Sequence, residues 1–136
     1  MASYNKFQDF VEALGLEEHN LNTDTLKVYL SNAAPSASAD ADKADLAEIT
    51  NENGYTAPVD IQNAMSESGG TATVTAVDVT ITASGGTVGP FQYAVIYNDD
   101  HPADGLVCWW DYGSAITLQD GEDFTVDFGA SLFTLT

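Results

Sequence analysis

Basic side chains are the scarcest feature of this sequence. The chain contains no arginine and only three lysines against 21 aspartates and glutamates, which gives a formal net charge of −18. A surface this negative repels phosphate backbones and anionic membrane surfaces, so we expect neither nucleic acid nor a membrane as a partner. The absence of arginine also excludes enzymes that hold a phosphate or carboxylate group in a guanidinium fork. The lysines, Lys6, Lys27 and Lys43, all lie in the first third of the chain.

Thiols and long apolar runs are equally scarce. Cys108 is the single cysteine, which excludes an intrachain disulfide and a zinc site made of thiolates. Its neighbours Val107 and Trp109 predict a buried, unreactive thiol. The sequence contains no run of 18 apolar residues, so it predicts no transmembrane helix. The first ten residues, MASYNKFQDF, lack the charged-then-apolar layout of a secretory signal.

Apolar residues, by contrast, make up 44% of the 136 positions, which is enough to build a hydrophobic core and argues against a disordered chain. The length suits one domain and is short for two. We therefore expect a single domain over 1–136, with a helix at 3–15, a loop-rich middle at 32–70 and a β-rich portion at 71–136.

The N-terminal segment 3–15 has the periodicity of an amphipathic helix. Its apolar residues recur at helical spacing and form one stripe, and Gly15 provides a natural C-terminal stop. A helix of about three turns is stable only when it packs on other elements. We therefore expect its two phenylalanines to lie in the core. The stripe consists of Phe7, Phe10, Val11 and Leu14.

The segment 25–31 alternates between apolar and other residues, which predicts a half-buried strand. The small and polar residues of 32–45 then predict an exposed loop, and a single helical turn is expected within 45–51. The strand would bury one face, formed by Leu26, Val28 and Leu30.

From Thr71 onward the sequence is rich in threonine, valine and isoleucine, which favour strands. Over 71–83 the apolar residues change parity between Ala76 and Val77, so we expect a strand with a bulge or bend at that point. The glycine-rich segment 84–90 predicts a turn and not a phosphate cradle, because neither a helix nor a lysine follows it. Further strands are expected at 91–99, 106–113, 115–119 and 131–136.

A hairpin is expected near the end of the chain, and its apolar register indicates the loop length. A two-residue turn would place apolar residues opposite polar ones. A three-residue loop over 120–122 instead pairs Leu118 with Phe124. It also pairs Ile116 with Val126, so we expect the longer loop.

Together these elements predict a mainly β fold with a minor α component. The expected architecture is an antiparallel β-sandwich or small barrel with a short N-terminal amphipathic helix. Short turns join the later strands, and no helix between them could provide parallel crossovers.

Residues capable of catalysis or metal binding do not form a recognisable motif. His101 lies in a run of turn-forming residues, NDDHPADG, and no serine elbow of the G-x-S-x-G type accompanies it or His19. The acidic run DADKAD at 40–45 lacks the glycine and the distal glutamate of an EF-hand loop. A second acidic cluster at 120–123 predicts only weak screening by divalent ions. We therefore expect no enzymatic activity, no cofactor, and no catalytic or metal-binding residues.

Aromatic residues are the candidates for an interface. Trp109 and Trp110 are adjacent in an expected strand, so they must point to opposite faces. One of them is expected to lie off the core of a two-layer fold, either at a protein interface or a sugar-stacking surface, or packed under a loop or the helix. The candidate interface residues are Phe7, Phe10, Tyr93, Tyr97, Trp109, Trp110 and Tyr112.

The one-sided charge also predicts a pH response. Residues 44–136 hold acidic side chains without a single lysine or arginine. If these carboxylates mainly repel one another, their pKa values are higher in the folded state and mild acid stabilises the fold. A carboxylate held by backbone N–H groups has the opposite effect.

Five segments together resemble a family of short tailed-bacteriophage proteins that are virion structural proteins. The segments are KFQDFVEALG, DTLKVYLSN, GPFQYAVIYND, CWWDYG and LQDGEDFTVDF, and in this order they span nearly the whole chain. Members are described as head decoration (cement) proteins and sometimes as tail or fibre components. The family supplies no catalytic motif.

The resemblance implies a protein made in the cytoplasm of the bacterial host and located in the virion, on the capsid surface. The implied partner is the major capsid protein, bound from outside by a homotrimer near local threefold positions. The alternative is a tail or fibre component that binds a host-surface glycan or receptor. In the capsid reading, the lysine-containing first third is the region expected to approach the partner, whereas the alternative would bind a glycan through exposed aromatic residues.

Overall fold

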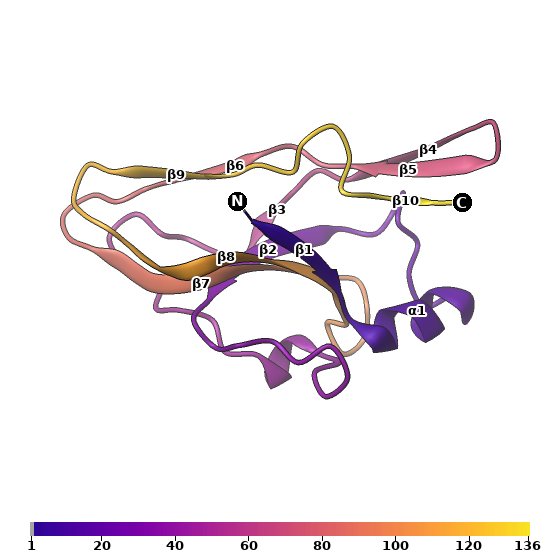
Figure 1. Cartoon of the computed structure of the whole chain (residues 1–136), viewed down its shortest axis with the longest axis horizontal. Coiled ribbons are helices and arrows are strands. Elements are labelled where there is room, and N and C mark those ends of the chain that lie inside the picture. Colours follow the sequence, from indigo (N-terminus) through magenta and orange to yellow (C-terminus); the bar gives the residue numbers. More distant parts are fainter. Residues whose placement is uncertain (1) are drawn as a thin grey trace.

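The computed structural model describes residues 2–136 (Figure 1). Its elements are β1 (Ser3–Lys6), α1 (Gln8–Gly15), β2 (Leu26–Ser31), the 3-10 turn η1 (Lys43–Asp45), β3 (Val59–Asp60), β4 (Ala64–Ser68), β5 (Thr71–Thr75), β6 (Val79–Thr82), β7 (Val88–Asn98), β8 (Leu106–Leu118), β9 (Asp123–Val126) and β10 (Phe133–Leu135).

The strands form a mainly β, sandwich-like fold with antiparallel sheets, as the sequence predicts. A five-stranded sheet with the order β1-β8-β7-β2-β3 makes one layer. Two smaller sheets, β10-β5-β4 and β6-β9, lie over one face of it, and α1 and η1 lie on the other side (Figure 1). Both faces of the central sheet are therefore covered.

The N-terminal segment differs from the helix expected at 3–15. Residues Ser3–Lys6 form the edge strand β1 on β8, and the helix begins only at Gln8. Tyr4 packs edge-on against Trp110 at 5.6 Å between ring centroids, a cross-strand contact that favours the strand. Phe7 and Phe10 are buried as expected, but Val11, assigned to the same stripe, is 51% exposed.

The strand β2 is buried on both faces, which corrects the expectation of a half-buried strand. Tyr29, on the face assigned to solvent, is 1% exposed. Its hydroxyl donates to the carbonyl of Leu46 at 3.0 Å, and Lys43 lies over its ring. The segment after β2 thus covers the second face of the sheet.

The middle segment 32–70 contains more regular structure than its composition indicates. It includes the strands β3 and β4. Its helical turn η1 lies earlier than the expected 45–51 range and overlaps it only at Asp45. Asp42 and Asp45 form a capping box around that turn. Tyr55 donates its hydroxyl to Glu48 at 3.0 Å and accepts the backbone N–H of Leu30 at 2.9 Å, which protects part of the β2 edge.

The parity change near Ala76 marks a break between strands and not a bulge within one. β5 ends at Thr75 and pairs with β4 and β10, whereas β6 begins at Val79 and pairs with β9 in another sheet. The chain therefore changes sheets where the apolar pattern changes face. The exposed Val77 lies in this connection.

The long hairpin of β7 and β8 forms the centre of the main sheet. β7 begins at Val88, inside the segment 84–90 expected as a turn, and β8 continues through the gap expected between 106–113 and 115–119. Gly113 has a φ of +86°, so a residue without a Cβ accommodates the left-handed backbone within the strand.

The expected hairpin pairing at the end of the chain is wrong. Phe124 pairs with Ile81 in β6, and Leu118 pairs with Val88 in β7. β8 and β9 lie in different layers, and 119–122 carries the chain between them (Figure 1). The apolar alternation of β9 is real, but it matches a strand 40 residues earlier as well as it matches the preceding one. Val126 likewise pairs with Val79, and Ile116 with Phe91.

Candidate functional site

Both tryptophans are covered by other parts of the chain. They point to opposite faces of β8, as expected, but each face has its own covering layer. Trp109 packs against Phe7 at 4.5 Å between centroids, and Trp110 packs against Phe128 at 5.4 Å. The three-layer arrangement therefore removes the need for either indole to lie on an open surface.

The seven candidate interface aromatics do not form a single exposed surface. Phe7, Phe10, Tyr97 and Trp109 are buried, and the other three are half-buried against the core. Tyr112 packs edge-on against Phe124, and its burial raises its pKa to about 12, with Asp127 adding to the effect. The half-buried members are Tyr93, Trp110 and Tyr112.

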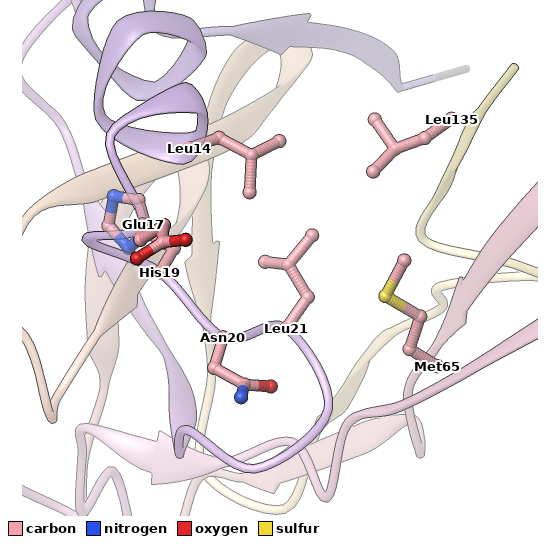
Figure 2. A pocket seen from close by; sticks show the side chains of 7 residues that line it. All are labelled: Leu14, Glu17, His19, Asn20, Leu21, Met65 and Leu135. Atoms are coloured by element: carbon pink, nitrogen blue, oxygen red, sulfur yellow. The ribbon is translucent and has the colours of Figure 1, made fainter.

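An open groove lies between α1 and the three-stranded sheet β10-β5-β4. Its volume is about 530 Å³, and four apolar side chains point into it from separate elements (Figure 2). Leu14 extends from α1 and Leu21 from the following loop, while Met65 of β4 and Leu135 of β10 form the opposite wall. Glu17, His19 and Asn20 supply its polar end.

A second section continues the groove along the open side of the sandwich. Its volume is about 250 Å³, and it shares Leu14 and Leu135 with the first section. The edge strands β1 and β10 lie along it and contribute Tyr4, Lys6 and Phe133. We refer to both sections together as the α1 groove.

The sequence gives no direct signal for this groove. Its wall residues Leu14, Leu21, Met65 and Leu135 come from four segments spread over 122 positions of the chain. Each looks like an ordinary apolar position in its own segment. Only Val11 offers a hint, because the helical stripe predicts a wider apolar face than the core uses.

A polar joint closes one end of the groove and contains both histidines. The rings of His19 and His101 stack at 5.1 Å between centroids. The buried Asn98 donates from Nδ2 to Asp24 Oδ2 at 2.7 Å and contacts His19 Nδ1 at 2.9 Å. Its Oδ1 accepts the backbone N–H of Asp100. We call this set the histidine joint; the tertiary fold assembles it from residues more than 70 positions apart.

Both histidines use Nδ1 as a hydrogen-bond acceptor in the joint. His101 Nδ1 accepts the backbone N–H groups of Ala103 and Gly105, both at 3.2 Å, so its proton lies on Nε2, 3.9 Å from Glu18 Oε2. Asn98 Nδ2 likewise makes His19 Nδ1 an acceptor. Burial lowers the pKa of His19, and the repulsion that protonated His19 would meet from a protonated His101 lowers it further. The nearby carboxylates Asp24, Glu18 and Asp9 have smaller opposing effects on this pKa.

Two carboxylates follow the second of the two cases considered from the sequence, in which N–H donors lower the pKa of a carboxylate. The N–H groups of Ala41 and Asp42 donate to Asp45 and lower its pKa. The Gln92 amide and the Gly113 N–H lower the pKa of Asp111 in the same way. These carboxylates are stabilised in their charged form, so acid destabilises the fold through them.

Mild acid is therefore expected to lower the melting temperature. The pKa of His19 lies below its ordinary value of 6.5, so its contribution to stability is complete above that pH and is lost as the pH falls below it. A second decrease is expected as the pH falls through 3.8, the ordinary value for Asp45 and Asp111. Thermal melts followed by circular dichroism at constant ionic strength measure both steps.

His19→Gln provides the control for this pH prediction. Glutamine keeps a polar side chain but does not titrate, so the first decrease should disappear while the second remains. A melting temperature that rises on acidification, or a first step that persists in the variant, would contradict the assignment.

Acidic side chains at the 120–122 loop serve local structure. Asp120 Oδ1 accepts the N–H of Gly85 at 2.9 Å, and Glu122 Oε1 accepts the N–H of Gln119 at 2.6 Å.

Among residues 2–136, no three His, Cys, Asp or Glu side chains converge as a metal ion requires. Cys108 is fully buried, which raises its thiol pKa. In that same range, no helix has both the length and the apolar content to span a membrane.

Comparison with protein-family models, with curated proteins and with solved structures finds no significant match to this chain. The site is thus defined by its own geometry: an apolar groove with two strand edges on a strongly acidic body, and a histidine joint at one end.

Proposed function

We propose that the protein is a non-enzymatic virion structural protein of a bacteriophage. In this proposal it is a head decoration protein that binds the outside of the major capsid shell and stabilises it. The resemblance of five ordered segments to phage virion proteins supports the assignment. The observation that carries it is the α1 groove, because a body with a net charge of −18 presents an open apolar groove on one side.

The distribution of the lysines refines which part of the first third approaches the shell. Lys27 pairs with Asp99 at 2.9 Å, and Lys43 pairs with Glu48 at 3.4 Å. Both lysine ammonium groups are thus paired with carboxylates of the same chain. Lys6 alone lies in the α1 groove. Docking would then depend on apolar contact and on positive charge supplied by the partner.

A homotrimer on the capsid is part of the proposal. Three copies that each carry −18 repel one another in solution, and a shell surface with threefold symmetry holds them in place. We therefore expect assembly on the particle at a copy number matched to the capsid lattice.

The test is reconstitution on shells produced without this protein. We expect saturable binding at a fixed ratio to the capsid protein, a higher melting temperature of the shell, and density on its outer surface in a particle map. A protein that stays in the supernatant, or density confined to the tail, would refute the decoration role. Light scattering on the pure protein completes the test, because a stable dimer with few copies per particle also contradicts it.

A further inference from the structure

Two of the large apolar side chains that are more than one-third exposed line the α1 groove. In the range 2–136 the side chains with this exposure are Tyr4, Val11, Leu16 and Val77, and three of these four lie between positions 4 and 16. Tyr4 and Val11 line the groove directly. Exposed apolar side chains that gather beside a concave surface are typical of a binding site and not of a solvated face.

The geometry of the groove suits an extended segment. It runs between two edge strands, β1 of the five-stranded sheet and β10 of the sheet β10-β5-β4. Each of these strands is paired on one side only. An edge strand offers free backbone N–H and C=O groups to an added strand. The apolar walls would receive every second side chain of that strand, since alternate residues point to the same face.

The negative charge of the chain favours a positively charged segment as the ligand of the groove. Glu17 lines the groove, and Asp9, Glu12 and Glu18 also lie on α1 or directly after it. Lys6 is the single lysine in the first 26 residues. A second copy of this chain would bring another −18 to the same surface. A segment with lysine or arginine between its apolar residues would instead be attracted to a chain with a net charge of −18.

We propose that the α1 groove is the docking site for an extended basic segment of the partner protein, with alternating apolar residues that fill the space between Leu14, Leu21, Met65 and Leu135. This inference rests on the proposed function in one respect: it takes the capsid protein to be the source of that segment. The groove itself can be tested without a capsid.

The first test uses nuclear magnetic resonance on the ¹⁵N-labelled protein with two synthetic peptides. One alternates lysine with valine, and the other alternates glutamate with valine. We expect the basic peptide to shift the amides of the groove walls and the acidic peptide to leave them unchanged. Shifts that lie elsewhere, equal shifts from both peptides, or shifts that grow with protein concentration alone would overturn the proposal, the last because a second copy would then be the occupant.

Leu14→Lys is the matched variant, and Val77→Lys is its control. Both add one positive charge, but Val77 lies in the β5–β6 connection and does not line the groove. We expect Leu14→Lys to raise the Kd of the basic peptide at least about tenfold, with a change of less than about twofold for Val77→Lys. Equal effects would refute the site. If Leu14→Lys does not fold, Val11→Lys replaces it, since Val11 is already 51% exposed.

Shell binding by the same variants separates this inference from the proposed function. If wild-type protein binds shells and Leu14→Lys binds equally well, the groove is not the docking site although the decoration role stands. If the basic peptide occupies the groove but wild-type protein ignores shells, the groove proposal stands and the decoration role fails.

Discussion

Phe10→Ala is expected to lower the free energy of unfolding by about 3–5 kcal/mol, which corresponds to roughly 10–15 °C in melting temperature for a chain of this length. Phe10 is 5% exposed and joins α1 to two other parts of the fold. Its ring lies 5.2 Å from that of His19 and 5.8 Å from that of Phe133. Truncation leaves a cavity where α1, the histidine joint and β10 meet, so three elements lose contact at once.

Gln8→Ala is the control for this prediction, because Gln8 is exposed on the same helix. Alanine is a strong helix former, so we expect this variant to melt within a few degrees of wild type. Thermal and denaturant unfolding measure both variants. Equal small losses would show that α1 is a mobile arm that contributes little to the stability of the isolated protein.

Asn98→Ala is expected to cost about 2–3 kcal/mol, because it leaves a charged acceptor and a buried imidazole without their donor. Asn98 is fully buried, and its amide connects Asp24, His19 and the backbone of Asp100. Asn98 joins the loop that follows α1 to the loop between β7 and β8, together with the stacked imidazoles and the hydrogen bonds of Thr25 with Asp99 and Asp100. We expect both loops to lose amide protection in hydrogen exchange.

Asn32→Ala serves as the matched control, since Asn32 is exposed. It should change stability by about 0.5 kcal/mol or less. An Asn98→Ala protein that unfolds at the same denaturant concentration as Asn32→Ala would show that water replaces the amide without cost, and that the joint does not hold the two loops together.

Local patterns account for much of the fold. The burial of Phe7 and Phe10, the strand around Val28 and the final strand that contains Phe133 all follow from periodicity over a few neighbouring residues. Such patterns are reliable because alternation or a helical stripe states which side chains share a face. They fail where a short segment serves a distant strand, as Ser3–Lys6 does on β8.

The candidate site was less accessible to prediction. The aromatic residues are candidates because they are large and clustered in sequence, yet Trp109 is buried against Phe7 and Trp110 is half-buried against Phe128. His101 lies in a run of turn-forming residues, and nothing in its spacing from His19 indicates that the two rings stack. A polar joint and a groove depend on which loops meet, and that information is absent from any single segment.

The amino-acid sequence by itself determined the charge of −18, the mainly β class, the antiparallel connections and the approximate position of the helix. The tertiary structure alone decided that β9 pairs with β6, that both faces of β2 are covered, and that Leu14 and Leu135 face each other across a groove. The physical reason is that alternation fixes the face of each side chain but not the neighbour of each strand. That neighbour is chosen by the packing of all layers together, where many weak apolar contacts between distant residues outweigh any local preference.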